Sequence, residues 1–274
     1  MNLENLNLLN KTTQAFSQKV TLEIFVGRFT IRTIANSSEL LEAFKLRYQV
    51  FQFEMIGHSE SEGIDFDDYD SHADHLAVFD SKTNQMVATC RLNSSLFAKK
   101  FYSEQEFNCQ ALLSKPENKL ELGRVCVHKD FRKGVIIMLL WRAIADYMIK
   151  TKTEILFGCG SVMTENPQDA VTIYKYLVEQ GKVKTENKVF PTDKYTSTEF
   201  NALLNQQKNI LSIEDTQLAA KLLPALCRSY FDIGCYVPGP PAFDHEFKCI
   251  DFLTILESHQ LDSKLKQKMF GASL

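Results

Sequence analysis

A segment near the middle of the chain places two oppositely charged residues in an otherwise apolar run. Glu121 and Arg124 both lie in this segment, which ends at His128. A charged side chain in an apolar strand costs free energy unless it is paired or has a chemical role. Glu121 is therefore a candidate general base for an amine, directly or through water, and Arg124 would order a neighbouring acid or bind a substrate carboxylate. The competing interpretation is an ion pair that only stabilises the sheet.

The spacing of these two residues determines which face of a strand each side chain points to. In a regular strand, Glu121 and Gly123 point to one face, whereas Arg124, Cys126 and His128 point to the other. The two charged side chains can act together only if a β-bulge shifts this alternation. A glycine between them favours such a bulge, so we predict one near Gly123.

A short basic segment follows the expected strand and precedes an apolar helical run. It consists of Arg132, Lys133 and Gly134. Free backbone N–H groups at a helix start, the helix dipole and two cations would meet there, which favours a bound phosphate. The segment is a candidate for binding phosphopantetheine or a pyrophosphate, with an ordinary solvated turn as the alternative.

Further polar candidates lie upstream. Arg47 falls on an expected helix four residues before Phe51, and the acidic loop that follows ends at Asp70. The acids and glycines of this loop do not have the spacing of a calcium loop, so we predict no metal site. His75 and His128 are candidates for direct roles, although a histidine in a strand more commonly packs in the core.

Hydrophobic periodicity and turn signals place these residues on alternating strands and helices. The expected order is β-α-β-β-β-α-β-α, followed by a less regular C-terminal part. The expected strands are residues 22–34, 75–79, 86–92, 120–128 and 155–158, and the expected helices are residues 37–55, 135–150 and 167–180. Loops are expected over residues 57–73 and 94–119, and a short helical run near residues 218–230.

Composition excludes several classes of protein. The 274 residues, 45% hydrophobic and 24% charged, predict a folded protein with a substantial core. The net charge of −3 provides no broad field for nucleic acid. The N-terminus lacks the pattern of a secretory signal and no apolar run could span a bilayer, so we expect a cytoplasmic protein. Seven cysteines without a Cys-x-x-Cys pair predict buried free thiols.

Several short motifs, spread over about residues 28–256, occur in a combination that is typical of one family. They are residues 46–51, 68–70, 74–76, 90–92, 101–107, 121–128, 139–142, 156–159, 223–226 and 239–244. Together they resemble the bacterial ornithine-lipid synthases, hemolysin-like N-acyltransferases that move a 3-hydroxyacyl chain from acyl carrier protein to the α-amine of ornithine. The resemblance implies an α/β (α+β) fold of the GNAT type, with a mixed central sheet flanked by helices and a C-terminal extension.

The same residues show a second, narrower resemblance. Arg47, Phe51, Asp70 and residues 121–124 also resemble the acyl-homoserine-lactone synthases, a related branch of this fold. That branch has a tryptophan shortly after the first helix, whereas the only tryptophan here is Trp141. We therefore interpret the lactone synthases as relatives and not as the identity of the chain.

The resemblance implies roles for individual residues. The expected catalytic residues are Glu121, Arg124, Asp70 and Arg47. The expected substrate-binding residues are Phe51, Asp68, His75, Arg91, Cys126 and His128. The expected phosphopantetheine-binding residues are Arg132, Lys133 and Gly134, with no bound cofactor and no metal. Val135 and Ile136 stand where acetyltransferases usually have a further small residue, which favours acyl carrier protein over acyl-CoA as donor.

The implied partners are acyl carrier protein, an amino-acid acceptor such as ornithine, and a second O-acyltransferase acting on the lyso-lipid product. That product would also bring the protein into peripheral contact with the inner membrane. Alternative functions are an acyl-CoA-dependent acetyltransferase on a small amine or protein, a lactone-synthase-like enzyme, and a non-catalytic lipid-binding relative. We expect a leader over residues 1–22, an acyltransferase domain over 23–256 with its core in 23–182 and a C-terminal part in 183–256, and a tail over 257–274.

Overall fold

The computed structural model describes residues 3–58, 63–132, 134–184, 188–206, 211–261, 263, 264 and 267. The chain divides into two compact units. The first comprises Met1–Phe101, Asn118–Glu154 and Lys266–Leu274, and the second comprises Tyr102–Glu117 and Ile155–Leu265. Each unit has its own cluster of buried apolar side chains.

Five antiparallel strands make the sheet of the first unit, each paired with the next along the chain. They are β1 (Glu23–Val26), β2 (Phe29–Thr33), β3 (Asp74–Asp80), β4 (Gln85–Ser94) and β5 (Lys119–Val127). The single strand expected over residues 22–34 is wrong, because that segment is the β1–β2 hairpin. Gly27 has a φ of +58° in its two-residue turn, a conformation that tight hairpins need and glycine adopts at little cost.

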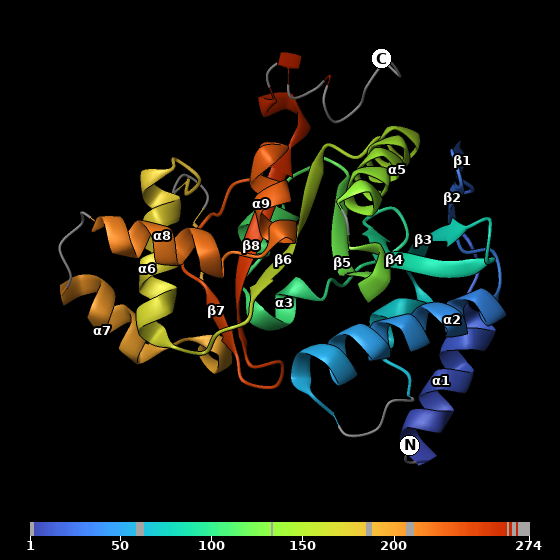
Figure 1. Ribbon diagram of the computed structural model, residues 1–274, viewed down its shortest axis with the longest axis horizontal. Helices are drawn as coiled ribbons and strands as arrows, with labels where there is room; N and C mark the ends of the chain where they lie inside the picture. Colours follow the sequence, from blue (N-terminus) through green and yellow to red (C-terminus); the bar gives the residue numbers. More distant parts are fainter. Residues whose placement is uncertain are drawn as a thin grey trace. The chain divides into compact units, whose positions relative to one another are not determined.

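Helices cover both faces of this sheet. The helix α2 (Ser37–Tyr48) packs Phe44 against His75, and α5 (Val135–Thr151) donates a hydrogen bond of 2.9 Å from the Tyr147 hydroxyl to Asp74. Because Asp74 and His75 are neighbours in one strand, they point to opposite faces, and so the two helices lie on opposite faces (Figure 1). The chain before β1 forms the helix α1 (Leu3–Ala15), which packs against α2.

The start and end of the α2 segment follow from its sequence. The Asn36 side chain accepts a hydrogen bond from the Glu39 backbone N–H at 3.1 Å and caps the helix. The helix continues through the π-helical turn η1 (Gln49–Ile56) and stops at Gly57, which has a φ of +84°. The expected helix over residues 37–55 is therefore confirmed.

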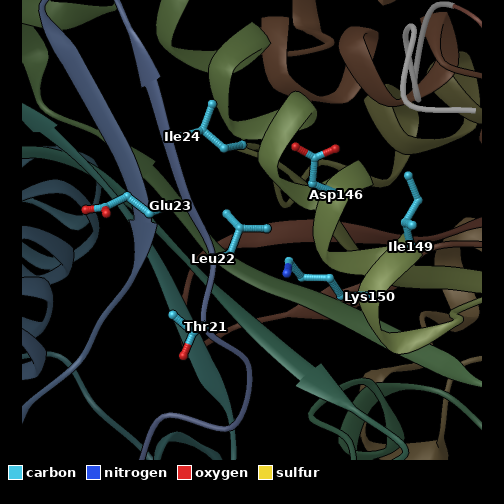
Figure 2. A pocket seen from close by; sticks show the side chains of 7 residues that line it. All are labelled: Thr21, Leu22, Glu23, Ile24, Asp146, Ile149 and Lys150. Atoms are coloured by element: carbon cyan, nitrogen blue, oxygen red, sulfur yellow. The ribbon is translucent and has the colours of Figure 1, made fainter.

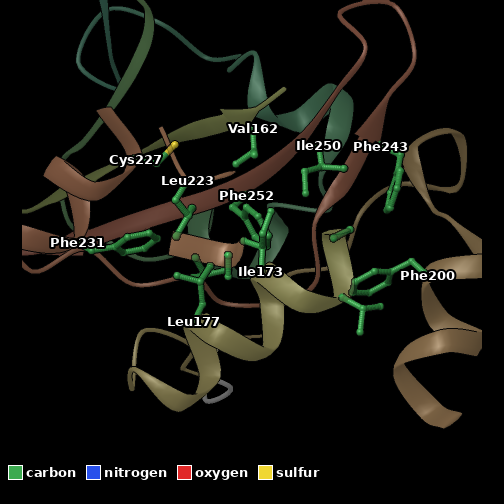
Figure 3. Close-up of a cluster of buried hydrophobic side chains, with 14 residues drawn as sticks. Val162, Ile173, Leu177, Phe200, Leu223, Cys227, Phe231, Phe243, Ile250 and Phe252 are labelled. Carbon is green, nitrogen blue, oxygen red and sulfur yellow. The ribbon is translucent and has the colours of Figure 1, made fainter. Parts of the chain in front are cut away.

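The second unit pairs β6 (Ile155–Val162) with β8 (Cys249–Glu257), and β8 with β7 (Ala242–Asp244). Its helices are α3 (Ser103–Glu106), α4 (Gln110–Leu113), α6 (Pro167–Glu179), α7 (Thr198–Gln206), α8 (Ile213–Leu222) and α9 (Ala225–Asp232). Side chains from α6, α7, β7 and β8 meet in one apolar cluster, in which the rings of Phe200 and Phe243 lie 6.0 Å apart (Figure 3).

Several elements of the second unit differ from the sequence-based expectation. The helical run expected over residues 218–230 is two helices, because Pro224 cannot continue α8 and instead precedes α9. The strands β7 and β8 were not expected. Short 3-10 turns complete the chain at η2 (Asp68–Ser71), η3 (Lys129–Phe131), η4 (Asp193–Tyr195) and η5 (Ser258–Gln260).

The helix α1 and the short helices α3 and α4, which lie within the expected loop 94–119, were also not expected. Apart from these differences, the expected alternation of strands and helices up to residue 180 is confirmed. Six of the seven cysteines are buried and all seven are free thiols, as expected. Within the described ranges, every helix is too short or too polar to traverse a bilayer. The division of the chain at residues 22, 182 and 256 stays a prediction.

Candidate active site

A β-bulge interrupts the pairing of β4 with β5. Arg91 is the partner of Gly123, and Thr89 is the partner of Cys126. One residue of β4 therefore faces two residues of β5, of which Arg124 has a φ of +51°. The predicted bulge is confirmed, and its left-handed residue is Arg124 rather than the glycine before it.

The bulge decides which side chains share a face of the sheet. Residues that are partners in an antiparallel ladder point to the same side, and Glu121 is the partner of Asn93. Asn93, Arg91 and Thr89 alternate along β4 and so share one face. The expectation that Cys126 points away from Glu121 is wrong, since Cys126 is the partner of Thr89.

On this face, three arginines and three aspartates form a closed ring of alternating charge. Its members, in order around the ring, are Arg47, Asp70, Arg91, Asp67, Arg124 and Asp65. They come from α2, the acidic loop, β4 and β5. The ring thus brings together four of the expected site residues, namely Arg47, Asp70, Arg91 and Arg124.

Asp70 is the most deeply buried member of the ring. Its Oδ1 atom accepts hydrogen bonds from Arg47 at 2.7 Å and from Arg91 at 3.0 Å. Burial alone would raise the pKa of Asp70, but the two guanidinium groups outweigh burial and hold that pKa well below its usual range. Asp70 is consequently a fixed anion that aligns two cations.

The other half of the ring centres on Arg124. Its guanidinium donates to Asp67 at 2.9 Å and lies 3.6 Å from Asp65. Asp67 also accepts from Arg91, and Asp65 also accepts from Arg47 at 2.9 Å. Burial would raise the pKa of Asp65, and Arg47 and Arg124 together lower it.

Local structure in the acidic loop explains why its aspartates converge. Asp67 begins the 3-10 turn η2, and its Oδ1 accepts from the Tyr69 N–H at 2.9 Å. Asp70, three residues later, accepts from the Asp67 N–H at 2.8 Å. This reciprocal capping box places both carboxylates on the same side of one turn.

His75 lies beneath the ring and is fully buried. Its Nε2 atom is 3.2 Å from the backbone oxygen of Asp70, and its ring packs between Phe16 and Phe44. Burial lowers the pKa of His75 to about 4, although Asp70 opposes this shift. His75 is therefore a neutral donor near pH 7 and positions Asp70.

Glu121 lies on the same face as the ring and is 3% exposed. Its Oε2 atom is 3.4 Å from the Asn93 amide nitrogen, which also donates to the Lys100 backbone oxygen at 3.0 Å. The Arg91 guanidinium interacts electrostatically with Glu121. A buried carboxylate of this kind can accept a proton from an amine brought against the sheet.

Comparison with known proteins identifies the kind of domain that carries these residues. Residues 46–142, which contain Glu121 and the whole ring, match the family described as an acetyltransferase (GNAT) domain. The L-ornithine N(alpha)-acyltransferase of Agrobacterium fabrum is 28% identical over 84% of this chain and 81% of that protein. The protein of the same name from Rhodobacter capsulatus is 25% identical over 87% of this chain and 93% of its own.

The chain is a GNAT-type acyltransferase. The predicted GNAT fold and the predicted family resemblance are confirmed. Among solved structures, the AHL synthase LasI aligns with 92% of this acyltransferase and 96% of its own chain, at 14% identity and a TM-score of 0.47.

Four other expected site residues of the acyltransferase are not members of the ring. Phe51 and Cys126 pack into the apolar cluster between α2 and the sheet. Asp68 is exposed at the turn and does not belong to the ring of charges. His128 follows β5, and its Nδ1 atom is 3.4 Å from the Asp130 N–H, so that it caps η3.

The basic segment before α5 is described in part. Gly134 has a φ of +86° and occupies the cap position of α5, where it has no side chain to satisfy the first N–H groups of the helix. Arg132 donates to the Val127 backbone oxygen at 2.8 Å and pairs with Glu54 at 2.6 Å. Lys133 lies outside the described residues.

Two members of the ring were not expected as site residues. The sequence offered Asp65 and Asp67 only as possible carboxylates for an ornithine side chain, or as part of a solvated loop. The signal that could have found them is balance of charge. Two buried arginines and one half-buried arginine need anions, and the loop supplies Asp65, Asp67 and Asp70.

A cavity of about 260 Å³ lies elsewhere on the first unit of the acyltransferase. It is lined by Thr21, Leu22, Glu23 and Ile24 and by Asp146, Ile149 and Lys150 of α5 (Figure 2). None of the expected site residues lines it. The chemistry of the candidate site therefore rests on the ring and Glu121.

Proposed function

We propose that this acyltransferase moves a 3-hydroxyacyl chain from acyl carrier protein to the α-amine of ornithine, giving a lyso-aminolipid. The names of the two relatives support the acceptor. The observation that carries the proposal is the buried Glu121 carboxylate, which lies on the same face of the sheet as the ring of alternating arginines and aspartates.

The proposed reaction begins with Glu121. Glu121 takes a proton from the α-ammonium group, and the free amine attacks the thioester carbonyl carbon. A C–N bond forms, the tetrahedral intermediate collapses, the C–S bond breaks, and the leaving thiolate takes up the proton that the attacking nitrogen loses. Glu121 then releases its proton to solvent. In this scheme, Arg47, Arg91 and Arg124 position the aspartates and the strand that carries the base, because each already pairs with an aspartate.

Asp68 is proposed to contact the positively charged side chain of the acceptor. The neighbouring Asp65, Asp67 and Asp70 are engaged by arginines, whereas Asp68 is exposed. A charged carboxylate near the acceptor would favour ornithine over glycine.

The start of α5 is the proposed contact for the donor's phosphate. The N-terminal N–H groups of a helix attract a phosphate, and Arg132 is 45% exposed beside them. The acetyltransferase domain match keeps acyl-CoA as the alternative donor. Calorimetry distinguishes them: tight binding of acetyl-CoA with no response to acyl carrier protein would favour the coenzyme A alternative.

An acceptor panel tests the proposed function. The purified protein is incubated with 3-hydroxyacyl carrier protein and separately with ornithine, lysine, glycine and serine, and products are identified by mass spectrometry. We expect an N-acyl product with ornithine at the highest rate. Failure to form an N-acyl product from any of these amines would reject the proposed function.

The proposed product has two further consequences. Its 3-hydroxyl group is a substrate for a second O-acyltransferase. Its acyl chain partitions into a bilayer, so we also propose peripheral contact of this cytoplasmic enzyme with the inner membrane. A flotation assay with liposomes tests this contact, which is rejected if all of the protein stays with the lipid-free fraction.

A further inference from the structure

A second group of charged side chains is buried entirely within the second unit. Asp244, Cys249 and Asp251 each offer one oxygen or sulfur atom, and these atoms lie within 4.8 Å of one another. Asp244 ends β7 and is the ladder partner of Cys249 on β8, while Asp251 follows two residues later on the same face. The β7–β8 hairpin therefore determines this convergence.

Glu106 is a fourth buried acid, close enough to this group to feel its charge. It is 1% exposed, and its carboxylate repels those of Asp251 and Asp244. Tyr102 and Cys159 hydrogen-bond to the carboxyl group, yet its Oε2 atom has no hydrogen-bond partner within the described part of the chain. A buried carboxylate oxygen without a donor is costly, so this atom itself indicates a missing cation or donor.

Hydrogen bonds hold two of the carboxylates in place. Asp251 accepts from the Ser161 hydroxyl at 2.6 Å and from the Cys249 thiol at 3.3 Å. Asp244 accepts from the backbone N–H groups of Glu246 at 2.8 Å and Phe247 at 3.1 Å. These contacts orient the donor atoms before any ligand binds.

Two of these acids lack a cationic partner in the described part of the chain. Among the described lysine, arginine and histidine residues, none forms an ion pair with Glu106 or Asp244. Lys194 feels the charge of Asp244, but its ammonium group is exposed and lies 3.3 Å from the Tyr195 hydroxyl. The ring in the first unit, by contrast, balances each buried aspartate with an arginine.

We propose that Glu106, Asp244, Cys249 and Asp251 form a binding site for one divalent metal ion. Carboxylate oxygens together with a cysteine sulfur are a donor set that Zn²⁺ accepts, with four ligands in a closed structural site. The ion would join the end of α3 to the β7–β8 hairpin. It would take no part in the proposed acyl transfer.

Metal binding is tested on the full chain after treatment with a chelator. The protein is dialysed, titrated with Zn²⁺ by calorimetry, and its metal content is then measured by plasma mass spectrometry. We expect about one ion per chain and a higher unfolding temperature than in the chelator, because an ion that binds only the folded state stabilises it. A metal content far below one ion per chain, with no thermal shift, would overturn the proposal.

Matched variants locate the site. Cys249→Ser and Asp251→Asn are expected to weaken Zn²⁺ binding at least tenfold. Cys227→Ser removes another buried thiol of the same unit, and Glu199→Gln removes an exposed acid, so both should bind as the wild type does. Replacing Zn²⁺ with Co²⁺ adds a thiolate charge-transfer absorption band, which Cys249→Ser should abolish and Cys227→Ser should keep.

Glu106→Gln separates metal binding from a loss of fold. This change removes the repulsion between the Glu106 carboxylate and those of Asp251 and Asp244, so the variant should unfold at a higher temperature than the wild type in the chelator while losing the stabilisation by Zn²⁺. Unchanged Zn²⁺ binding in both Glu106→Gln and Cys249→Ser would contradict the proposal. Stabilisation of the wild type by 1,4-diaminobutane but not by Zn²⁺ would also overturn it, because the group would then bind an organic ammonium ion. These readouts do not depend on acyl transfer and remain informative if the proposed function fails.

Discussion

Glu121 and Arg124 serve the same face of the sheet although they are three positions apart on β5. Arg124 bonds to Asp67 at 2.9 Å, and Asp67 also binds Arg91, whose neighbour across the ladder is Gly123. A regular strand would have placed the two side chains on opposite faces. The bulge at Arg124 thus joins the candidate base to the ring of charges.

Replacing Glu121 tests the candidate base directly. Glu121→Gln keeps the size and the contact with Asn93 but cannot take up a proton at neutral pH. We expect kcat to fall by about a hundredfold to ten-thousandfold with little change in the unfolding temperature. Steady-state kinetics with ornithine and thermal melts measure both effects, and an unchanged kcat would remove Glu121 from the role of base.

Asp70→Asn tests the ring. The substitution leaves Arg47 and Arg91 buried with less negative charge between them, so we expect a loss of about 3–5 kcal/mol in the free energy of unfolding. Asp68→Asn is the matched control, because Asp68 is exposed two residues away and should change stability by less than about 0.5 kcal/mol. Urea denaturation measures both, and equal effects of the two changes would contradict the structural importance of the ring.

His75 predicts a particular dependence of stability on pH. Its pKa is about 4 in the folded protein and 6.5 in an unperturbed chain, so between these values only the unfolded state is protonated. Stability should therefore decrease as the pH falls, by about 2 kcal/mol between about pH 7 and about pH 5.

The His75→Gln variant isolates this effect. Its amide can still donate to the Asp70 backbone oxygen but does not titrate. Urea denaturation at the two pH values should show a smaller loss for the variant than for the wild type. Asp70 does not affect this comparison. Because its pKa is lowered in the folded protein, its contribution to stability is lost only when the pH falls below the usual pKa of an aspartate. Identical slopes for both proteins would rule out His75 as the titrating group.

Gly123→Ala tests which residue the bulge requires. A Cβ atom at Gly123 would meet only the Arg91 guanidinium, at 3.8 and 3.9 Å, which is ordinary contact. The positive φ belongs to Arg124, so the alanine variant should lose no more than about 1 kcal/mol and keep its activity. A loss of several kcal/mol would show instead that the bulge needs a glycine.

The sequence by itself determined the local features of this protein. The apolar periodicity of α5, the turn residues of the β3–β4 hairpin and the charged pair in β5 are local patterns, and each was predicted from nearby residues. The family motifs also indicated Arg47, Asp70, Arg91 and Arg124 as site residues. The strand pattern over residues 22–34 did not predict the β1–β2 turn, because a single glycine within a strand-like run is a weak indication of a turn.

Only the tertiary structure decided which of these residues meet. Asp65 and Asp67 joined the ring because a loop folds back against three arginines from α2, β4 and β5, a balance of buried charge that no local spacing expresses. Likewise, Asp244, Cys249 and Asp251 are brought together by a hairpin that the sequence did not predict, and Glu106 joins them from more than a hundred residues earlier. Long-range pairing and burial, rather than residue type, place these charges, since the cost of an unpaired buried charge is determined by everything packed around it.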